Sequence, residues 1–371
     1  MRFSGTKTSP TKIIVVLATM VLALSSSIWT QSLSSSSTSS DASSAQVQTI
    51  APPPALERWR GLIGEYGTDK AILYILESDG MLCASFARAT PSCLTELSQN
   101  NFKFGSDGQH PNEQVAFTRD TNGQPTQVKL GDATYARRQI GPEEGAPQLH
   151  VAPIRPVKDL IKEALAAQPP KEVGDFRKSD LVELTGLDPT IKLDIRYAST
   201  NNFLGTVFYS EPRAFMQRPA AEAVVRVNQK LKKLGYGLLI HDAYRPWYIT
   251  KVFWDATPVD KHIFVADPSQ GSRHNRGCAV DLTLYDLKTG KPVEMVSTYD
   301  ETTDRAYPDY PGGTSLQRWH RKLLRDAMES EGFKVYEAEW WHFDYKDWQH
   351  YGIGNETFEK LETDGHLLQR G

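Results

Sequence analysis

Two stretches decide how this chain is expected to fold: SRHNRGCAVDLTLYD at residues 272–286 and EWWHFDY at residues 339–345. In the first, CAVDLTLYD has the composition of a strand. Because strand side chains alternate between faces, Val280 and Leu282 would point into a core and Asp281 would face the opposite side, towards a cleft. The second stretch is rich in aromatic residues and also predicts a strand. Each stretch therefore carries polar residues that could meet in one site.

The sequence around these stretches predicts both helices and strands. Residues 218–236 and 315–333 space their apolar residues as amphipathic helices do, and Gly235 and Gly332 lie at the ends of those segments. Buried or half-buried strands are predicted over the ranges 180–188, 190–197, 237–242 and 333–345. Helices interspersed with separated strand runs indicate an α+β fold for residues 176–371.

A different pattern precedes this region. Residues 71–86 place strand-like segments on both sides of Ser78-Asp79-Gly80, and residues 117–130 repeat the scheme around a second turn signal. We therefore expect a small all-β domain over 55–140. It carries no chemical motif, which favours a packing or binding role. A Pro- and Gly-rich linker with a short helix would follow over 141–175.

The N-terminus is typical of an exported protein. Basic residues precede the apolar run 13–24, and small residues follow it, so residues 1–27 are expected to be a signal peptide. The run is shorter than a spanning helix requires, and no stable membrane span is expected after processing. An uncleaved anchor is the alternative. Residues 28–54, rich in Ser and then Pro, predict a flexible tether. The protein would then be periplasmic or secreted.

Composition limits the partners. The 371 residues are 39% hydrophobic and 23% charged, which suits an ordinary globular protein. The net charge is −3 and the isoelectric point is near 6.3. A large basic surface is therefore not expected, and nucleic acid is excluded as a partner.

Three cysteines are present. In an oxidising compartment, Cys83 and Cys93 could form a disulfide across a hairpin, or both could be small buried thiols; the sequence leaves both readings open. Cys278 lies among small apolar residues and is expected in the core.

Four separated residues could form a metal centre with its base. Catalytic zinc usually takes three protein ligands and keeps one position for water, and His274, Asp281 and His342 supply such a set. Glu339 would act as the general base. Glu339 and His342 are three residues apart, so on a flat strand they would face opposite sides. The strand must therefore twist, bulge or end between them.

A third motif, HDAYRPW at 241–247, adds a cation. Arg245 would lie at the C-terminal end of a strand, where its guanidinium could meet a developing oxyanion. Asp242 could orient Arg245 through a charged hydrogen bond.

Together, SRHNRGCAVDLTLYD, EAEWWHF and IHDAYRP resemble the zinc-dependent D-alanyl-D-alanine dipeptidases, the VanX-like family within the superfamily of D-Ala-D-Ala peptidases and hedgehog-type domains. The resemblance covers residues 176–371 and implies a central antiparallel sheet flanked by helices. It implies one zinc ion held by His274, Asp281 and His342, with Glu339 as catalytic base. Four further roles follow from it.

By the same resemblance, Arg245 would stabilise the tetrahedral intermediate with Asp242 as its orienter. Ser272 would contact the substrate, and Asp300 would lie near the substrate ammonium group, although STYDE departs from the commoner family wording there. Asp242, Ser272 and Asp300 are thus the candidate substrate-binding residues.

The expected activity is zinc-dependent hydrolysis of D-alanyl-D-alanine in peptidoglycan metabolism or glycopeptide resistance. One alternative is an exported carboxypeptidase that trims peptidoglycan stem peptides. A dipeptidase needs a cap that excludes longer peptides, and residues 199–217 are the candidate. Another alternative is a non-catalytic, zinc-containing wall-binding module. The all-β domain could itself bind peptidoglycan.

Overall fold

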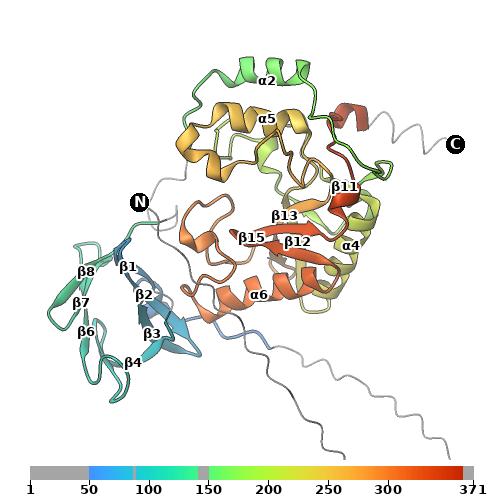
Figure 1. Ribbon diagram of the computed structural model, residues 1–371. Helices are drawn as coiled ribbons and strands as arrows, with labels where there is room; N and C mark the ends of the chain where they lie inside the picture. Colours follow the sequence, from blue (N-terminus) through green and yellow to red (C-terminus); the bar gives the residue numbers. More distant parts are fainter. Residues whose placement is uncertain (1–49, 87–88, 141–149, 362–371) are drawn as a thin grey trace, which may run out of the picture. The chain divides into compact units, whose positions relative to one another are not determined.

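The computed structural model describes residues 50–86, 89–140 and 150–361 (Figure 1). The expected signal peptide 1–27 and all but the end of the tether 28–54 lie outside these residues, as does the start of the second linker. Within the described part of the chain, no helix is long and apolar enough to cross a membrane.

A five-stranded sheet forms the centre of the C-terminal region. Its order is β10 (Lys192–Leu193), β12 (Tyr236–Asp242), β13 (Ala279–Asp286), β15 (Glu339–Tyr345) and β14 (Phe333–Tyr336). The short edge strand β10 runs parallel to β12, and all other pairs are antiparallel. The predicted α+β class is therefore confirmed, with a sheet that is mainly antiparallel.

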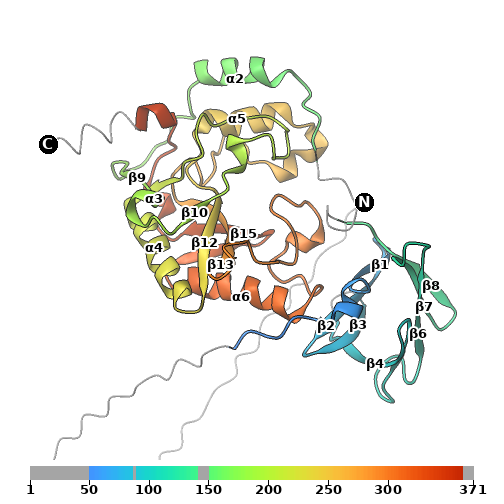
Figure 2. The ribbon, with the colours of Figure 1, turned by 180° about the vertical axis from the view of Figure 1, so that it is seen from behind.

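Helices cover both sides of this sheet. The helices α4 (Arg218–Lys232) and α6 (Ser315–Glu329) contact each other and pack on β12 and β14 respectively. The helices α2 (Val157–Ala166) and α5 (Trp247–Ala256) pack together on the other side (Figures 1 and 2). The short helix expected in the 141–175 linker is thus α2.

The two long helices form for reasons visible in the sequence. Helix α4 buries Val224, Val227 and Leu231, which recur at helical spacing on the face that meets the sheet. Helix α6 begins with a capping box, in which the Thr314 hydroxyl accepts from the Gln317 amide and the Gln317 side chain accepts from the Thr314 amide. This box satisfies backbone donors that a helix start leaves without partners.

Several predicted strands differ from the structure. Only Leu181–Glu183 of the range 180–188 is a strand, β9, which pairs with β11 (Phe215–Gln217) and is followed by helix α3 (Leu184–Leu187). The range 190–197 gives only the two residues of β10 and then a 3₁₀ turn. The range 333–345 is a hairpin of two strands. Short apolar runs suit helix and strand equally, so periodicity could not separate these cases.

Residues 64–136 form a second sheet, in which eight strands pair antiparallel in sequence order. The predicted turn at 78–80 is confirmed between the second and third strands, and the turn in 117–130 is confirmed between the sixth and seventh. The strands are β1 (Gly64–Thr68), β2 (Ala71–Ser78), β3 (Met81–Phe86), β4 (Ser92–Ser98), β5 (Asn101–Phe104), β6 (Gln114–Arg119), β7 (Pro125–Leu130) and β8 (Ala133–Ala136).

The two edges of the eight-stranded sheet meet. A bridge joins Tyr66 of β1 to Arg137, directly after β8, and the Arg138 amide donates to the Glu65 carbonyl. One side of the sheet encloses its own apolar core, which includes Leu73, Phe102 and Phe117. Closure removes the open edges that would otherwise expose unpaired backbone groups.

The disulfide left open by the sequence is formed. Cys83 on β3 lies opposite Cys93 on β4, and the two sulfur atoms are bonded. Cys278 is a free, buried thiol, and burial raises its pKa to about 12. It is the core residue that the sequence indicated.

The disulfide should stabilise the protein by restricting the unfolded chain. Cys83 and Cys93 are separated by 10 residues. A loop of that size is expected to contribute about 3 kcal/mol to the free energy of unfolding. Urea denaturation of Cys83→Ser/Cys93→Ser should show this loss, and a reducing agent should destabilise the wild type but not the double variant. Equal stability of all samples would contradict the prediction.

Candidate metal centre

Sheet register places three polar residues in one row. On β12, β13 and β15, Asp242 lies opposite Asp281, and Asp281 lies opposite His342. Paired residues of antiparallel strands project from the same face. Val280 and Leu282 are fully buried in the apolar core on the other side, as the alternation of β13 predicted.

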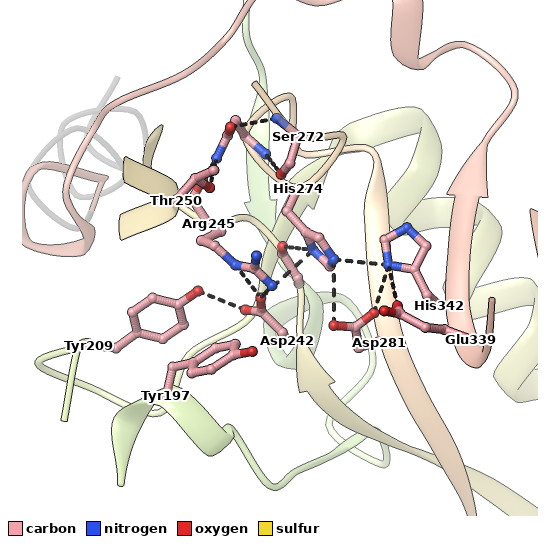
Figure 3. A network of polar contacts seen from close by, with 12 residues as sticks. Tyr197, Tyr209, Asp242, Arg245, Thr250, Ser272, His274, Asp281, Glu339 and His342 are labelled. Carbon is pink, nitrogen blue, oxygen red and sulfur yellow. Dashed lines mark hydrogen bonds and ion pairs between the residues drawn. The ribbon is translucent and has the colours of Figure 1, made fainter. Parts of the chain in front are cut away.

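His274 joins this row from the turn that precedes β13. Its Nε2 atom lies 3.2 Å from His342 Nδ1 and 3.5 Å from Asp281 Oδ2, and His342 Nδ1 lies 3.0 Å from Asp281 Oδ1. One ligand atom from each of the three residues lies within 4.8 Å of the others (Figure 3). Residues from two distant parts of the sequence therefore converge around a single point.

Hydrogen bonds fix which imidazole nitrogens face that point. The Nδ1 atom of His274 is 2.7 Å from the Ala243 carbonyl, to which it can donate, so Nε2 is left as the electron-pair donor. His342 has the opposite arrangement, because its Nε2 lies 3.0 Å from Asp344 Oδ1 and its Nδ1 faces Asp281. A partner on the far nitrogen is the usual way in which proteins orient metal-binding histidines.

The charges of the site call for a cation. Burial raises the pKa of Asp281, but the imidazoles of His274 and His342 outweigh it and hold the pKa well below the usual range. Burial lowers the pKa of His342, yet hydrogen bonds to Asp281 and Asp344 raise it to about 10. Asp281 Oδ1 is also buried, and it lies 3.0 Å from His342 Nδ1. The site thus concentrates buried carboxylate charge beside two imidazoles.

These features fit a divalent metal ion. Two imidazole nitrogens and one carboxylate oxygen are a donor set typical of catalytic zinc. A cation among them would neutralise the buried carboxylates.

Tyr299 completes the surroundings of Asp281. Its hydroxyl donates to Asp281 Oδ2 over 3.0 Å, and its ring stacks on His241 with centroids 4.7 Å apart. Burial and the nearby Asp281 charge raise the pKa of Tyr299 well above its usual value, so the hydroxyl stays protonated and remains a donor. The orientation of Asp281 is therefore fixed from outside the ligand set.

Glu339 reaches the same side as His342 because the hairpin is irregular. Val335 of β14 pairs with Phe343, but the next residue, Tyr336, pairs with Glu339, so β15 contains extra residues at this point. The strand is therefore irregular between Glu339 and His342, as their separation by three residues required. Glu339 Oε2 lies 3.7 Å from His342 Nδ1, and burial raises its pKa. A carboxylate with a raised pKa beside the metal point is suited to accept a proton.

Arg245 and Asp242 form a buried pair behind His274. Arg245 donates from Nε and Nη2 to Asp242 Oδ2 over 2.9 and 2.7 Å, and Tyr209 donates to Oδ1 over 2.8 Å. Asp242 is fully buried and does not line the cavity, so its position suits an orienter of Arg245 and not a contact to substrate. Arg245 itself lines the cavity.

A cavity of about 450 Å³ opens over the metal point. All three candidate ligands contribute to its wall, together with Glu339, Arg245, Ser272 and Asp300. The predicted cap, 199–217, supplies only Phe203. Most of the remaining wall comes from the segments 257–273 and 300–307.

Ser272 and Asp300 occupy different parts of this cavity wall. Ser272 belongs to the turn before His274, and its Oγ accepts from the Asn275 amide over 3.3 Å. Asp300 has a left-handed backbone, with φ of 60°, and its Oδ2 accepts from the Tyr197 hydroxyl over 3.3 Å. Burial and the charges of Asp281 and Glu339 raise the pKa of Asp300 to about 8.

Some residues of the site were missed at the level of sequence. Asp344 lies two residues after His342 on one strand, and this alternation could have revealed it. Tyr299 had no comparable signal, because its bond to Asp281 crosses 18 residues through a loop. Tyr197 and Tyr209 likewise come from a segment without motif-like spacing.

The fold and this site together are those of an α+β protein with a candidate catalytic metal centre. The sequence profile of the peptidase M15 family, described as D-ala-D-ala dipeptidase, matches residues 177–361. The D-alanyl-D-alanine dipeptidase of Escherichia coli K12 is 32% identical over 166 residues, which are 45% of this chain and 84% of that protein. The chain belongs to the D-alanyl-D-alanine dipeptidase family of peptidases.

Two further relatives support this assignment. The D-alanyl-D-alanine dipeptidases of Enterococcus faecium and Enterococcus faecalis V583 are 32% and 33% identical, and the matches cover 42% and 41% of this chain and 87% and 85% of those proteins. A solved LdcB LD-carboxypeptidase structure is 20% identical over 53% of this chain and 80% of its own, with a TM-score of 0.28. That score is too low for any conclusion about this chain.

Asp344 should strengthen metal binding by holding His342. The Asp344→Ala variant removes the acceptor of Nε2, so the ring can rotate and its Nδ1 is no longer directed at the metal point. Loss of such a partner typically weakens metal affinity by about 10- to 100-fold. Competition with a zinc chelator measures it. Asp344→Asn, which keeps an acceptor oxygen, should lose much less, and equal affinity of all three proteins would contradict the role.

Proposed function

We propose that this protein is an exported zinc peptidase that hydrolyses D-alanyl-D-alanine or a closely related D-amino-acid dipeptide. The observation that carries the proposal is the convergence of His274, Asp281 and His342 next to Glu339 in one cavity. Family membership supports the reaction class, and the names of the relatives support the substrate.

The ligand set proposed for zinc is His274 Nε2, Asp281 and His342 Nδ1. Zinc held there supplies a Lewis acid that makes a water molecule acidic near neutral pH and polarises a carbonyl group. Glu339 would take the proton of the attacking water and pass it to the leaving amine, because its carboxylate lines the cavity beside this point.

Arg245 is proposed to stabilise the oxyanion that develops on the substrate carbonyl. Its Nε and Nη2 are held by Asp242, which fixes the plane of the guanidinium and leaves Nη1 for the substrate. Because Arg245 is almost fully buried, its charge is poorly screened, and it acts without reorganisation of solvent. Asp242 thus acts on the reaction through Arg245.

Substrate recognition is proposed to use two residues of the cavity wall, Asp300 and Ser272. Asp300 would bind the ammonium group of the dipeptide, since an approaching cation lowers the raised pKa of this carboxyl and favours its ionised form. Ser272 would donate to a carbonyl or carboxylate oxygen of the substrate. The cavity volume of about 450 Å³ is suited to a small ligand.

A carboxypeptidase acting on peptidoglycan stem peptides is the second candidate. The proposed export favours this candidate, because an exported enzyme would meet stem peptides in the cell wall. The disulfide between Cys83 and Cys93 supports an oxidising compartment, and so supports residues 1–27 as a signal peptide. A peptidoglycan contact through strands β1–β8 remains a proposal of the same kind. A non-catalytic wall-binding module would have no need of Glu339.

Glu339→Gln should separate metal binding from turnover. The amide cannot accept the proton of the attacking water, and loss of a general base typically lowers kcat by about 10²- to 10⁴-fold. Zinc content should remain at one ion for each chain, because Glu339 is outside the ligand set. Amine release from D-alanyl-D-alanine and metal analysis of the same sample give the two values. Unchanged kcat would remove Glu339 from its role.

Substrate length distinguishes the two peptidase candidates. With residues 257–273 and 300–307 closing the cavity, free D-alanyl-D-alanine should be hydrolysed with a kcat/KM at least about 100-fold above that for a pentapeptide stem ending in the same two residues. Product analysis on the full chain measures both. A preference for the stem would establish the carboxypeptidase in place of the dipeptidase.

A further inference from the structure

The cavity wall depends on a loop with little regular structure of its own. Residues 295–314, called the wall loop below, contain only the 3₁₀ turn Asp304–Ala306. The loop lines the cavity with Asp300–Asp304, Ala306 and Tyr307. It also carries Tyr299, which donates to Asp281. Both the substrate pocket and a candidate metal ligand therefore depend on where this loop lies.

The wall loop is held at its end by two buried carboxylates from the eight-stranded sheet. Glu65 of β1 accepts from the Tyr310 hydroxyl over 2.9 Å, and its other oxygen lies 3.0 Å from Arg138 Nε. Glu77 of β2 accepts from the Ser315 amide over 2.7 Å. Both glutamates are at most 2% exposed. A buried carboxylate is costly without partners, so these contacts strongly disfavour displacement of the loop.

Further contacts fix the same segment. The Glu77 amide donates to the Gly313 carbonyl over 3.1 Å, and the Tyr74 ring meets Tyr310 edge-on with centroids 5.8 Å apart. Arg305 links the loop to the residues that follow β8, because its guanidinium donates both to the Val296 carbonyl and to the Ile140 carbonyl over 3.1 and 2.9 Å.

Apolar packing also joins the eight-stranded sheet to the C-terminal region. Tyr74, Leu76 and Cys83 project from the outer face of the eight-stranded sheet and pack in the same apolar cluster as the residues of the five-stranded sheet. The eight-stranded sheet lies outside residues 177–361, the part that matches the peptidase family. It is therefore an addition to the family domain that reaches the wall of the candidate active site.

We propose that the eight-stranded sheet is a positioning element of the peptidase, in which Glu65 and Glu77 hold the wall loop in the conformation that binds substrate. Glu65 is the clearest positioning residue, because it acts through one hydroxyl, that of Tyr310. Asp300 supports this proposal, since its left-handed backbone persists only where the surroundings determine it. The role differs from that of a detachable wall-binding module.

Glu65→Ala in the full chain, loaded with zinc, tests the proposal. The variant removes the acceptor of Tyr310, so hydrogen exchange of the amides of residues 296–309 should accelerate. KM for D-alanyl-D-alanine should rise about tenfold with a smaller change in kcat. The reason is that the loop lining the substrate cavity would be displaced more than the groups that carry out the reaction. Glu65→Gln, whose amide oxygen can still accept from Tyr310, should restore most of both properties.

The matched control is Glu96→Ala. Glu96 lies in the same sheet, and its side chain accepts from Arg58 over 2.9 Å and from Trp59 over 3.1 Å, neither of which belongs to the wall loop. The Glu96→Ala variant should leave the amide hydrogen exchange of residues 296–309 and the KM unchanged. If Glu65→Ala does not fold, Tyr310→Phe removes the same hydrogen bond from the loop side and is expected to show the same changes.

The two readouts separate this inference from the proposed function on which its kinetic part rests. Unchanged exchange and unchanged KM in Glu65→Ala would overturn the positioning role, as would a loss of stability with normal kinetics. If the wild type does not hydrolyse D-alanyl-D-alanine, the proposed function fails, and the exchange of residues 296–309 alone decides the inference.

Discussion

The burial of Asp281 among two imidazoles is the constraint on which the rest of the structure depends. A carboxylate buried in the middle of a sheet is stable only with close polar partners, and His274 and His342 bring imidazole nitrogens beside it from two separate segments. Their far nitrogens are in turn held by the Ala243 carbonyl and by Asp344. The site is thus arranged around one point, where a divalent ion fits the donor set.

Groups around this centre divide into those that face the cavity and those that orient them. Glu339 and Arg245 line the cavity, and they are the groups suited to move a proton and to stabilise an oxyanion. Asp242 and Tyr299 lie behind them and act by hydrogen bonds on Arg245 and Asp281 respectively. Supporting partners of this kind hold Arg245 and Asp281 in fixed orientations, which a precise site requires.

The wall of the cavity has a different origin from its floor. The floor is built on strands β12, β13 and β15, whose pairing fixes the ligands. The wall comes largely from loops, one of which is held by Glu65 and Glu77 of a sheet outside the family domain. Loops on a rigid scaffold are where related enzymes change specificity most readily. An added sheet that supports a loop is one physical means to such a change.

The sequence by itself determined the α+β class, the long helices, and the candidate ligands His274, Asp281 and His342, because strand alternation and metal-ligand chemistry are local properties. It also showed that Glu339 and His342 require an irregular strand. Only the tertiary structure decided that the 333–345 range is a hairpin, that Asp242 lies behind Arg245, and that Tyr299 supports Asp281. The hairpin and the depth of Asp242 depend on strand register and on the packing around it, and the Tyr299 contact joins residues 18 apart through a loop, so spacing in the sequence does not fix them.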